Sequence, residues 1–174
     1  MLNHHFDFGN IVVPPNAPVG TVLASQAKGN NGDVHIFCQT GGTIHYWLNP
    51  PWVTSTSVDN TYATNIPGVG IRVGARGGDW WFSPIDGHPA IWDSYNNVQS
   101  GYVEFSIIKT GEVTSGGSLD TGFVGYIADD FGTHAVEVWL NNASISLPAC
   151  NLNDGKPIDV DFGSAIATTD VASG

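Results

Sequence analysis

The segment Tyr102-Val-Glu-Phe-Ser-Ile-Ile-Lys109 decides the fold, because apolar and polar side chains alternate along most of it. Successive side chains of a β-strand point to opposite faces, so the alternation places one face in a core and the other toward water. A second segment, Ala135–Asn141, alternates in the same way. The expected inward set is Val103, Phe105, Ile107, Val136, Val138 and Leu140, and the outward set is Glu104, Ser106, Glu137, Trp139 and Asn141. Both patterns predict antiparallel sheets with one buried face each.

The other apolar segments are short, rich in β-branched or aromatic residues, and bounded by Gly, Pro, Asn or Asp. This pattern is typical of strands and turns, and no long stretch shows a helical period. The further strands that we predict are Gly9–Val13, Gly20–Ser25, Val34–Cys38, Thr43–Leu48, Gly70–Val73, Phe123–Ile127 and Ile158–Phe162. So many short strands predict an all-β sandwich or barrel.

The composition excludes several classes of partner. The 174-residue chain has 16 acidic and 5 basic side chains and a formal net charge of −11, which repels phosphate backbones and anionic lipids. We therefore expect no nucleic acid and no membrane surface as a partner. No apolar run approaches the ~20 residues of a membrane-spanning helix, and the N-terminal segment lacks the features of a signal peptide. The length suits one main domain plus a fragment.

The segment Gly74–Ser100 is the strongest candidate for a binding site, because it is too long for one strand and combines tryptophans with short polar side chains. Aromatic faces stack on the apolar face of a sugar ring, while carboxylates and guanidinium groups bond its hydroxyls. The candidate ligand-binding residues are Arg76, Asp79, Trp80, Trp81, Asp86, Trp92 and Asp93. The alternative is that Trp80 and Trp92 plug the end of the fold. Trp47 and Trp139, within predicted strands, are expected in the core.

A second candidate site is the turn Asp129-Asp-Phe-Gly-Thr-His134. Its paired carboxylates offer acceptors for sugar hydroxyls, so the candidate residues are Asp129, Asp130 and His134. The alternative is a solvated hairpin tip with no binding role.

The histidines offer one candidate metal site, for zinc. A hairpin formed by the predicted strands at 34–38 and 43–48 would place His35 and His45 on one face. Zinc needs at least three ligands, and His88 or His134 would complete the set. The alternative, which we favour, is a set of hydrogen-bonded histidines and no cofactor. His4 and His5, at a chain end, are expected to take no part in such a metal site.

No motif predicts an enzyme. Asp120-Thr-Gly122 matches the aspartic-protease triplet, but that chemistry needs two carboxylates sharing a proton, and the sequence has one copy. Cys38 and Cys150 belong to no Cys-x-x-Cys pair, which excludes a zinc ribbon and a redox motif. Whether these two cysteines pair with each other stays open.

Five stretches, in order along the chain, resemble the receptor-binding domain of bacterial chaperone–usher fimbrial tip adhesins. They are Val12–Leu23, Ile36–Cys38, Ala63–Val73, Val103–Gly111 with Gly116–Gly122, and Pro148–Cys150 with Pro157–Gly163. The resemblance implies an immunoglobulin-like antiparallel β-sandwich over residues 1–147, which would be the receptor-binding domain. Residues 148–174 would be a linker and the truncated start of a pilin domain.

The resemblance also implies a function and a location. The domain would bind a host cell-surface glycan or glycoprotein without catalysis, outside the cell at the fimbrial tip, after export through the periplasm. Its pilin domain would meet the adjacent pilus subunit, the periplasmic chaperone and the usher by β-augmentation. The alternative is an adhesin for a host matrix protein, with or without histidine-bound zinc. A structural pilin is disfavoured, because Met1–Phe8 is too short and too polar for a donor strand. Some members of the resembled family bind mannose through a hairpin that corresponds to residues 126–136. That hairpin is shorter in this sequence, so mannose specificity is not expected.

Overall fold

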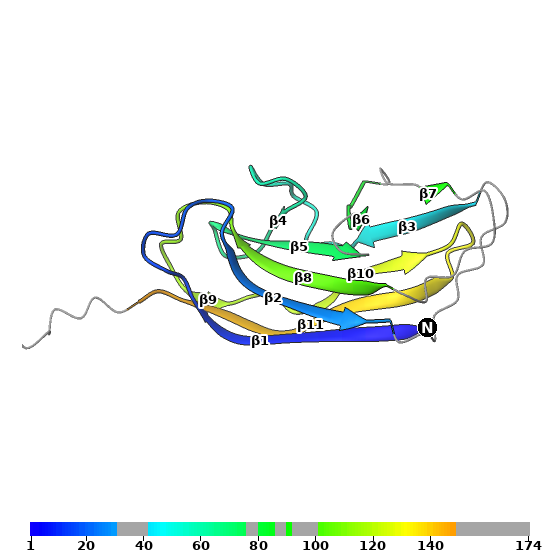
Figure 1. The fold of residues 1–174 in the computed structure, drawn as a ribbon. Coiled ribbons are helices and arrows are strands. Elements are labelled where there is room, and N and C mark those ends of the chain that lie inside the picture. Colours follow the sequence, from blue (N-terminus) through cyan, green and yellow to red (C-terminus); the bar gives the residue numbers. More distant parts are fainter. Residues whose placement is uncertain (31–41, 76–79, 86–89, 92–100, 149–174) are drawn as a thin grey trace, which may run out of the picture.

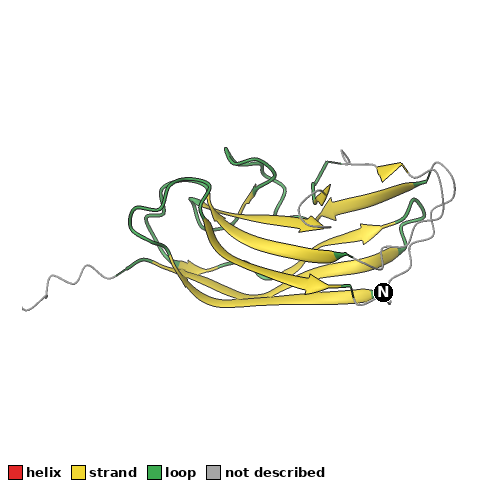
Figure 2. Ribbon diagram, viewed as in Figure 1, coloured by secondary structure: helices red, strands yellow, loops and turns green. Residues whose placement is uncertain are grey.

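The computed structural model describes residues 1–30, 42–75, 80–85, 90–91 and 101–148, which form strands and connecting loops without a helix (Figures 1 and 2). Among these residues, therefore, no helix is long and apolar enough to cross a membrane. The strands are β1 (Leu2–Val12), β2 (Val22–Gly29), β3 (Thr43–Leu48), β4 (Tyr62–Ala63), β5 (Val69–Ala75), β6 (Trp80–Trp81), β7 (Ala90–Ile91), β8 (Tyr102–Lys109), β9 (Gly117–Ser118), β10 (Gly122–Ala128) and β11 (His134–Ser146).

The strands of the described residues form two sheets. Sheet I has the order β1-β11-β10-β3-β7, with β9 beside β11, and sheet II has the order β2-β8-β5-β4, with β6 beside β5. The ladders between these strands are antiparallel apart from the pair β1 and β11, which is parallel. Parallel neighbours need a long connection, and here most of the domain lies between the two strands. The predicted immunoglobulin-like antiparallel sandwich is confirmed, with this one parallel edge.

The core lies between the sheets. The six side chains predicted to face inward from β8 and β11 are all fully buried, at 0% exposure. Their strands contribute one face each to a continuous apolar cluster, as the alternation requires. One predicted outward residue differs: Ser106 is only 2% exposed, because its hydroxyl donates a hydrogen bond to Glu104 Oε1 and lies 3.0 Å from the Ser25 hydroxyl.

The N-terminal strand is longer than predicted, and its histidines have partners. β1 begins at Leu2 rather than Gly9, because His4 and Phe6 alternate into the interior, 5% and 0% exposed. The His4 Nε2 atom lies 2.8 Å from Asn30 Oδ1. Burial lowers the pKa of His4, and this hydrogen bond only partly opposes the effect. His5 Nδ1 also lies 3.1 Å from Asn141 Oδ1, so both histidines are held by hydrogen bonds within the sheet and do not lie on a free chain end.

Other strand boundaries follow the sequence closely. The predicted bounds of β3 and β8 agree with the structure, whereas β11 continues past Asn141 to Ser146. The predicted strands at 34–38 and 158–162, and both cysteines, lie outside the described residues. The division of the chain at residue 147 stays a prediction.

Two tryptophans were assigned to the wrong face. Trp47 and Trp139 were expected in the core, although the alternation along 135–141 had already placed Trp139 outward, and both are only half-buried, on the outer face of sheet I. Their immediate neighbours along the strands, Tyr46 and Leu48 in β3 and Val138 and Leu140 in β11, are the buried residues. Because side chains alternate along a strand, the tryptophan between two inward neighbours must face outward.

Candidate functional site

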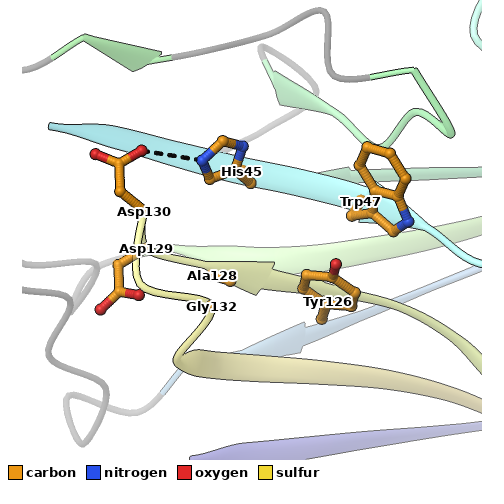
Figure 3. Close-up of a pocket in the computed structure, with 7 residues that line it drawn as sticks. All are labelled: His45, Trp47, Tyr126, Ala128, Asp129, Asp130 and Gly132. Atoms are coloured by element: carbon orange, nitrogen blue, oxygen red, sulfur yellow. Dashed lines mark hydrogen bonds and ion pairs between the residues drawn. The ribbon is translucent and has the colours of Figure 1, made fainter.

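A pocket of about 240 Å³ opens on the outer face of sheet I. It lies between β3, β10 and the turn that joins β10 to β11, at the opposite end of the domain from the last residues of β11 (Figures 1 and 3). The residues that line it are His45, Trp47, Tyr126, Ala128, Asp129, Asp130 and Gly132. Carboxylates and a histidine stand at one end and two aromatic rings at the other (Figure 3).

The two rings meet because of strand register. Tyr126 of β10 lies directly opposite Trp47 of β3. A register shift between Phe123 and Gly125 places Phe123 and Tyr126 on the same face, because a bulge re-aims the side chains that follow it. Gly125 is required for this packing: a Cβ atom there would lie 2.2 Å from the Trp47 carbonyl oxygen.

Asp129 builds the turn beside the pocket. Its Oδ1 atom accepts hydrogen bonds from the backbone N–H groups of Phe131, at 3.0 Å, and Thr133, at 2.8 Å. The N–H of Gly132 donates to the Asp129 carbonyl oxygen at 3.0 Å, and Gly132 has a φ of 76° that favours glycine. One Asp129 oxygen is thus committed to shaping the turn, a common use of Asp at such positions.

Asp130 presents a fixed, ionised carboxylate to the pocket. Its Oδ2 atom accepts a hydrogen bond from the backbone N–H of Thr43 at 2.7 Å, and its Oδ1 atom lies 3.1 Å from His45 Nε2. The Thr43 N–H, and after it the His45 ring, hold the pKa of the Asp130 carboxyl below its ordinary value. The side chain is still 42% exposed, so a ligand can reach it.

His134 lies next to the pocket rather than in its lining. Its ring stacks on Tyr126, with centroids 4.0 Å apart and an interplanar angle of 14°. Its Nδ1 atom lies 2.9 Å from Glu137 Oε1. The second candidate site from the sequence, Asp129, Asp130 and His134, is therefore gathered at one end of sheet I.

The tryptophan segment is described only in part. Trp80 packs against the core and stacks on Tyr46 at 5.7 Å, which agrees with the alternative of a plug. Trp81 lies beneath the Arg72 guanidinium group, 4.9 Å from it, and neither tryptophan lines the pocket. The other candidates in this segment lie outside the described residues and stay predictions: Arg76, Asp79, Asp86, Trp92 and Asp93.

The zinc alternative cannot be built from the part of the chain that the structure describes. Within that part, no group of three or more His, Cys, Asp or Glu side chains is placed to hold a metal ion. His45 contacts Asp130, while His35 and His88 lie outside the described residues.

The sequence analysis missed Trp47 and Tyr126 as pocket residues. The signal for Trp47 was present, since Ile44, Tyr46 and Leu48 define the inward face of its strand. Tyr126 had no comparable signal, because its direction depends on the bulge before Gly125.

Comparison with solved structures identifies the fold. The receptor-binding domain of the plasmid-borne adhesin MrkD1P of Klebsiella pneumoniae matches 88% of this chain and 96% of its own, with a TM-score of 0.60 and 20% identity. The CupB6 tip adhesin of Pseudomonas aeruginosa matches 83% of this chain and 39% of its own, with a TM-score of 0.50 and 11% identity. The fold is that of the receptor-binding domains of fimbrial adhesins.

Comparison of sequences identifies the family. The model of the MrkD-like receptor binding domain matches residues 5–142, most of the chain, so the protein belongs to this family. A fimbria adhesin protein of Klebsiella pneumoniae is 29% identical over 163 residues, which are 90% of this chain. The chain spans about half of that relative's length, 49%. The resemblance seen in the sequence is confirmed.

Proposed function

We propose that this domain attaches its fimbria to a host cell by binding a glycan, and that the pocket between β3 and β10 holds one sugar unit. The observation that carries the proposal is the pairing of the Trp47 and Tyr126 rings with the fixed Asp130 carboxylate in one small pocket. An aromatic ring packs on the apolar C–H face of a sugar. The carboxylate accepts hydrogen bonds from adjacent hydroxyls and fixes the orientation of the sugar.

The size and rigidity of the pocket support a small ligand. Its volume of about 240 Å³ lies below the ~300–1,000 Å³ of pockets for drug-sized molecules, which suits a single sugar ring. Asp130 is held by β3 without any ligand. Little side-chain ordering is then needed on binding, which favours affinity.

The remaining parts of the proposal rest on the family. The domain acts by binding alone, without a catalytic step. The full-length protein is extracellular at the fimbrial tip after export through the periplasm, and its pilin domain meets the chaperone, the usher and the neighbouring subunit.

A second candidate function is adhesion to a host matrix protein. The net charge of −11 and the exposed Asp130 carboxylate favour a basic protein segment, which a lysine side chain could anchor in the same pocket. Histidine-bound zinc would make such binding sensitive to EDTA.

A glycan array tests the first proposal. The wild-type domain is expected to give a saturable signal that free sugar competes away, and Trp47→Ala and Asp130→Asn should each abolish it. The matched control is Tyr102→Ala, which removes an exposed aromatic side chain of sheet II, 39% exposed, and should leave the signal intact. Absence of sugar binding, together with binding to immobilised matrix proteins, would overturn the glycan proposal in favour of the second candidate.

A further inference from the structure

Aromatic rings continue across sheet I beyond the pocket. Five rings on its outer face form what we term the aromatic row: His5, Phe123, Tyr126, His134 and Trp139. They come from β1, β11 and β10, three adjacent strands. The row meets the pocket at Tyr126, which belongs to both.

Successive rings of the row are in contact. The centroid of Trp139 lies 5.9 Å from that of His5 and 5.0 Å from that of Phe123. Phe123 lies 6.2 Å from Tyr126, and its ring is nearly parallel to the tyrosine ring, at 16°. These separations are those of favourable aromatic pairs, so the row is one continuous surface.

Hydrogen bonds within the row fix the orientation of its polar rings. Glu137 Oε2 accepts a hydrogen bond from the Trp139 indole N–H at 3.2 Å, while its Oε1 atom lies 2.9 Å from His134 Nδ1. The Glu137 side chain is only 15% exposed. The Trp139 N–H and both Glu137 oxygens are therefore engaged within the row, which leaves mainly apolar ring surface for a ligand and little freedom to lose on binding.

The row and the pocket together are longer than one sugar. From β1 to β3 there are three strand intervals in sheet I, which at about 4.8 Å each span about 14 Å. Trp47 lies opposite Tyr126 at the far side of this span. A ligand that filled only the pocket would leave the rings of β11 and β1 without a role.

The charges of the described part of this surface disfavour an anionic ligand. Among the residues that the structure describes, the pocket and the row carry the carboxylates Asp129 and Asp130, with Glu137 between the rings, and contain neither lysine nor arginine. The chain as a whole has a net charge of −11. A sulfated or sialylated glycan would approach like charges without a compensating base.

We infer that the ligand is a neutral linear oligosaccharide, with one terminal unit in the pocket and at least one further unit stacked on the aromatic row. This inference rests on the proposed glycan-binding function and assigns to it a ligand class and a second subsite. Trp139 is the central ring of that subsite, because it contacts the rings of both neighbouring strands.

The test measures affinity against chain length. Neutral gluco-, galacto-, manno- and N-acetylglucosamine oligosaccharides of one to five units, with sulfated counterparts, are titrated into the domain and followed by NMR. Wild-type affinity is expected to rise about tenfold from one unit to three or more, because an additional aromatic contact is worth about this factor. Trp139→Ala should remove the increase and keep the affinity for one unit, whereas Trp139→Phe, which keeps a ring, should restore most of it.

The outcomes separate this inference from the proposed function. Equal wild-type affinity for one and for several units, or an unchanged length dependence in a folded Trp139→Ala domain, would overturn the second subsite and leave the pocket in place. Tighter binding of the sulfated series would overturn the neutral ligand class. Failure of every sugar to bind would overturn the proposed function, and the inference with it. Thermal melting of each variant verifies that the domain is folded.

Discussion

The outer face of sheet I presents a row of contacting aromatic rings beside a pocket, whereas the outer face of sheet II presents small hydroxyl groups between β2 and β8, with the aromatic side chains of Tyr102 and Trp81 elsewhere on it. On sheet II, Ser25 and Ser106 lie 3.0 Å apart, and both hydroxyls donate to Glu104 Oε1. On sheet I, Trp139 and Phe123 lie side by side in neighbouring strands. Both sheets bury the same kind of aliphatic and aromatic inner face.

This difference shows which surface is available for recognition. Folding requires an apolar inner face of each sheet, but it does not require aromatic side chains on the outer face, where the directly paired residues Ser25 and Ser106 of sheet II are serines. Contiguous exposed apolar surface favours association and mostly marks interaction sites. The rings of sheet I are therefore better explained by binding than by stability.

Among the substitutions that test this difference between the sheets, Gly125→Ala is expected to have the largest effect on stability and sugar binding. The new Cβ atom would lie 2.2 Å from the Trp47 carbonyl oxygen and 3.2 Å from Phe82 Cδ2, so β3 and β10 must separate. Forcing extra atoms into such a contact destabilises by about 1–3 kcal/mol, and the pocket between these strands should lose sugar binding. Chemical denaturation and the glycan titration measure the two effects.

Gly111→Ala is the matched control, because the nearest atom to its Cβ is the Gly68 Cα at 3.6 Å, an ordinary contact. It is expected to change neither stability beyond about 0.5 kcal/mol nor binding. Wild-type stability in Gly125→Ala would mean that the two strands tolerate the added Cβ atom, and Gly125 would not be required for their packing.

Most of the fold could be predicted from the sequence, and the failures have local causes. The alternation in β8 and β11 identifies both the strands and their buried faces, because it depends only on successive residues. Polar residues concealed the start of β1, where His4 is buried by means of its hydrogen bond to the distant Asn30. A histidine is read as exposed unless its partner is known.

Less of the site could be predicted, because it depends on contacts between distant segments. The turn at 129–134 was recognised by its paired carboxylates, but the hydrogen bond from Thr43 that fixes Asp130 joins residues far apart in the chain. The direction of Tyr126 depends on a bulge, and a bulge reverses the face of every later side chain. Sequence alternation alone cannot locate it.

Acidification is expected to lower the free energy of unfolding by a smaller amount, through His4 of β1 at the edge of sheet I. Burial holds the pKa of His4 below its ordinary value in the folded protein, whereas in the unfolded chain it is about 6.5. The unfolded chain therefore binds more protons once the pH falls below about 6.5, and the free energy of unfolding decreases there as the pH falls. At higher pH this contribution is constant.

Thermal melting at pH 7.5 and pH 5.0 measures this effect. His4→Gln, which cannot titrate, should show a smaller decrease in Tm between the two pH values than the wild type. His5→Gln is the matched control, because His5 is exposed on the same strand, and it should behave like the wild type. An equal decrease in His4→Gln and the wild type would exclude His4 as a source of acid sensitivity.

The smallest effect is expected from Ser25→Ala on sheet II. The Ser25 hydroxyl donates to Glu104 Oε1 at 3.0 Å, but the residue is exposed, so water replaces the lost partner, and Glu104 keeps its hydrogen bond from Ser106. The change in the free energy of unfolding should stay within about 0.5 kcal/mol, and sugar binding should be unchanged. If Ser25→Ala leaves sugar binding unchanged while Trp139→Ala weakens it, the sugar is bound by the outer face of sheet I. A decrease in sugar affinity in Ser25→Ala would instead show that the hydroxyl face of sheet II takes part in binding, and the contrast between the two sheets would no longer identify the site.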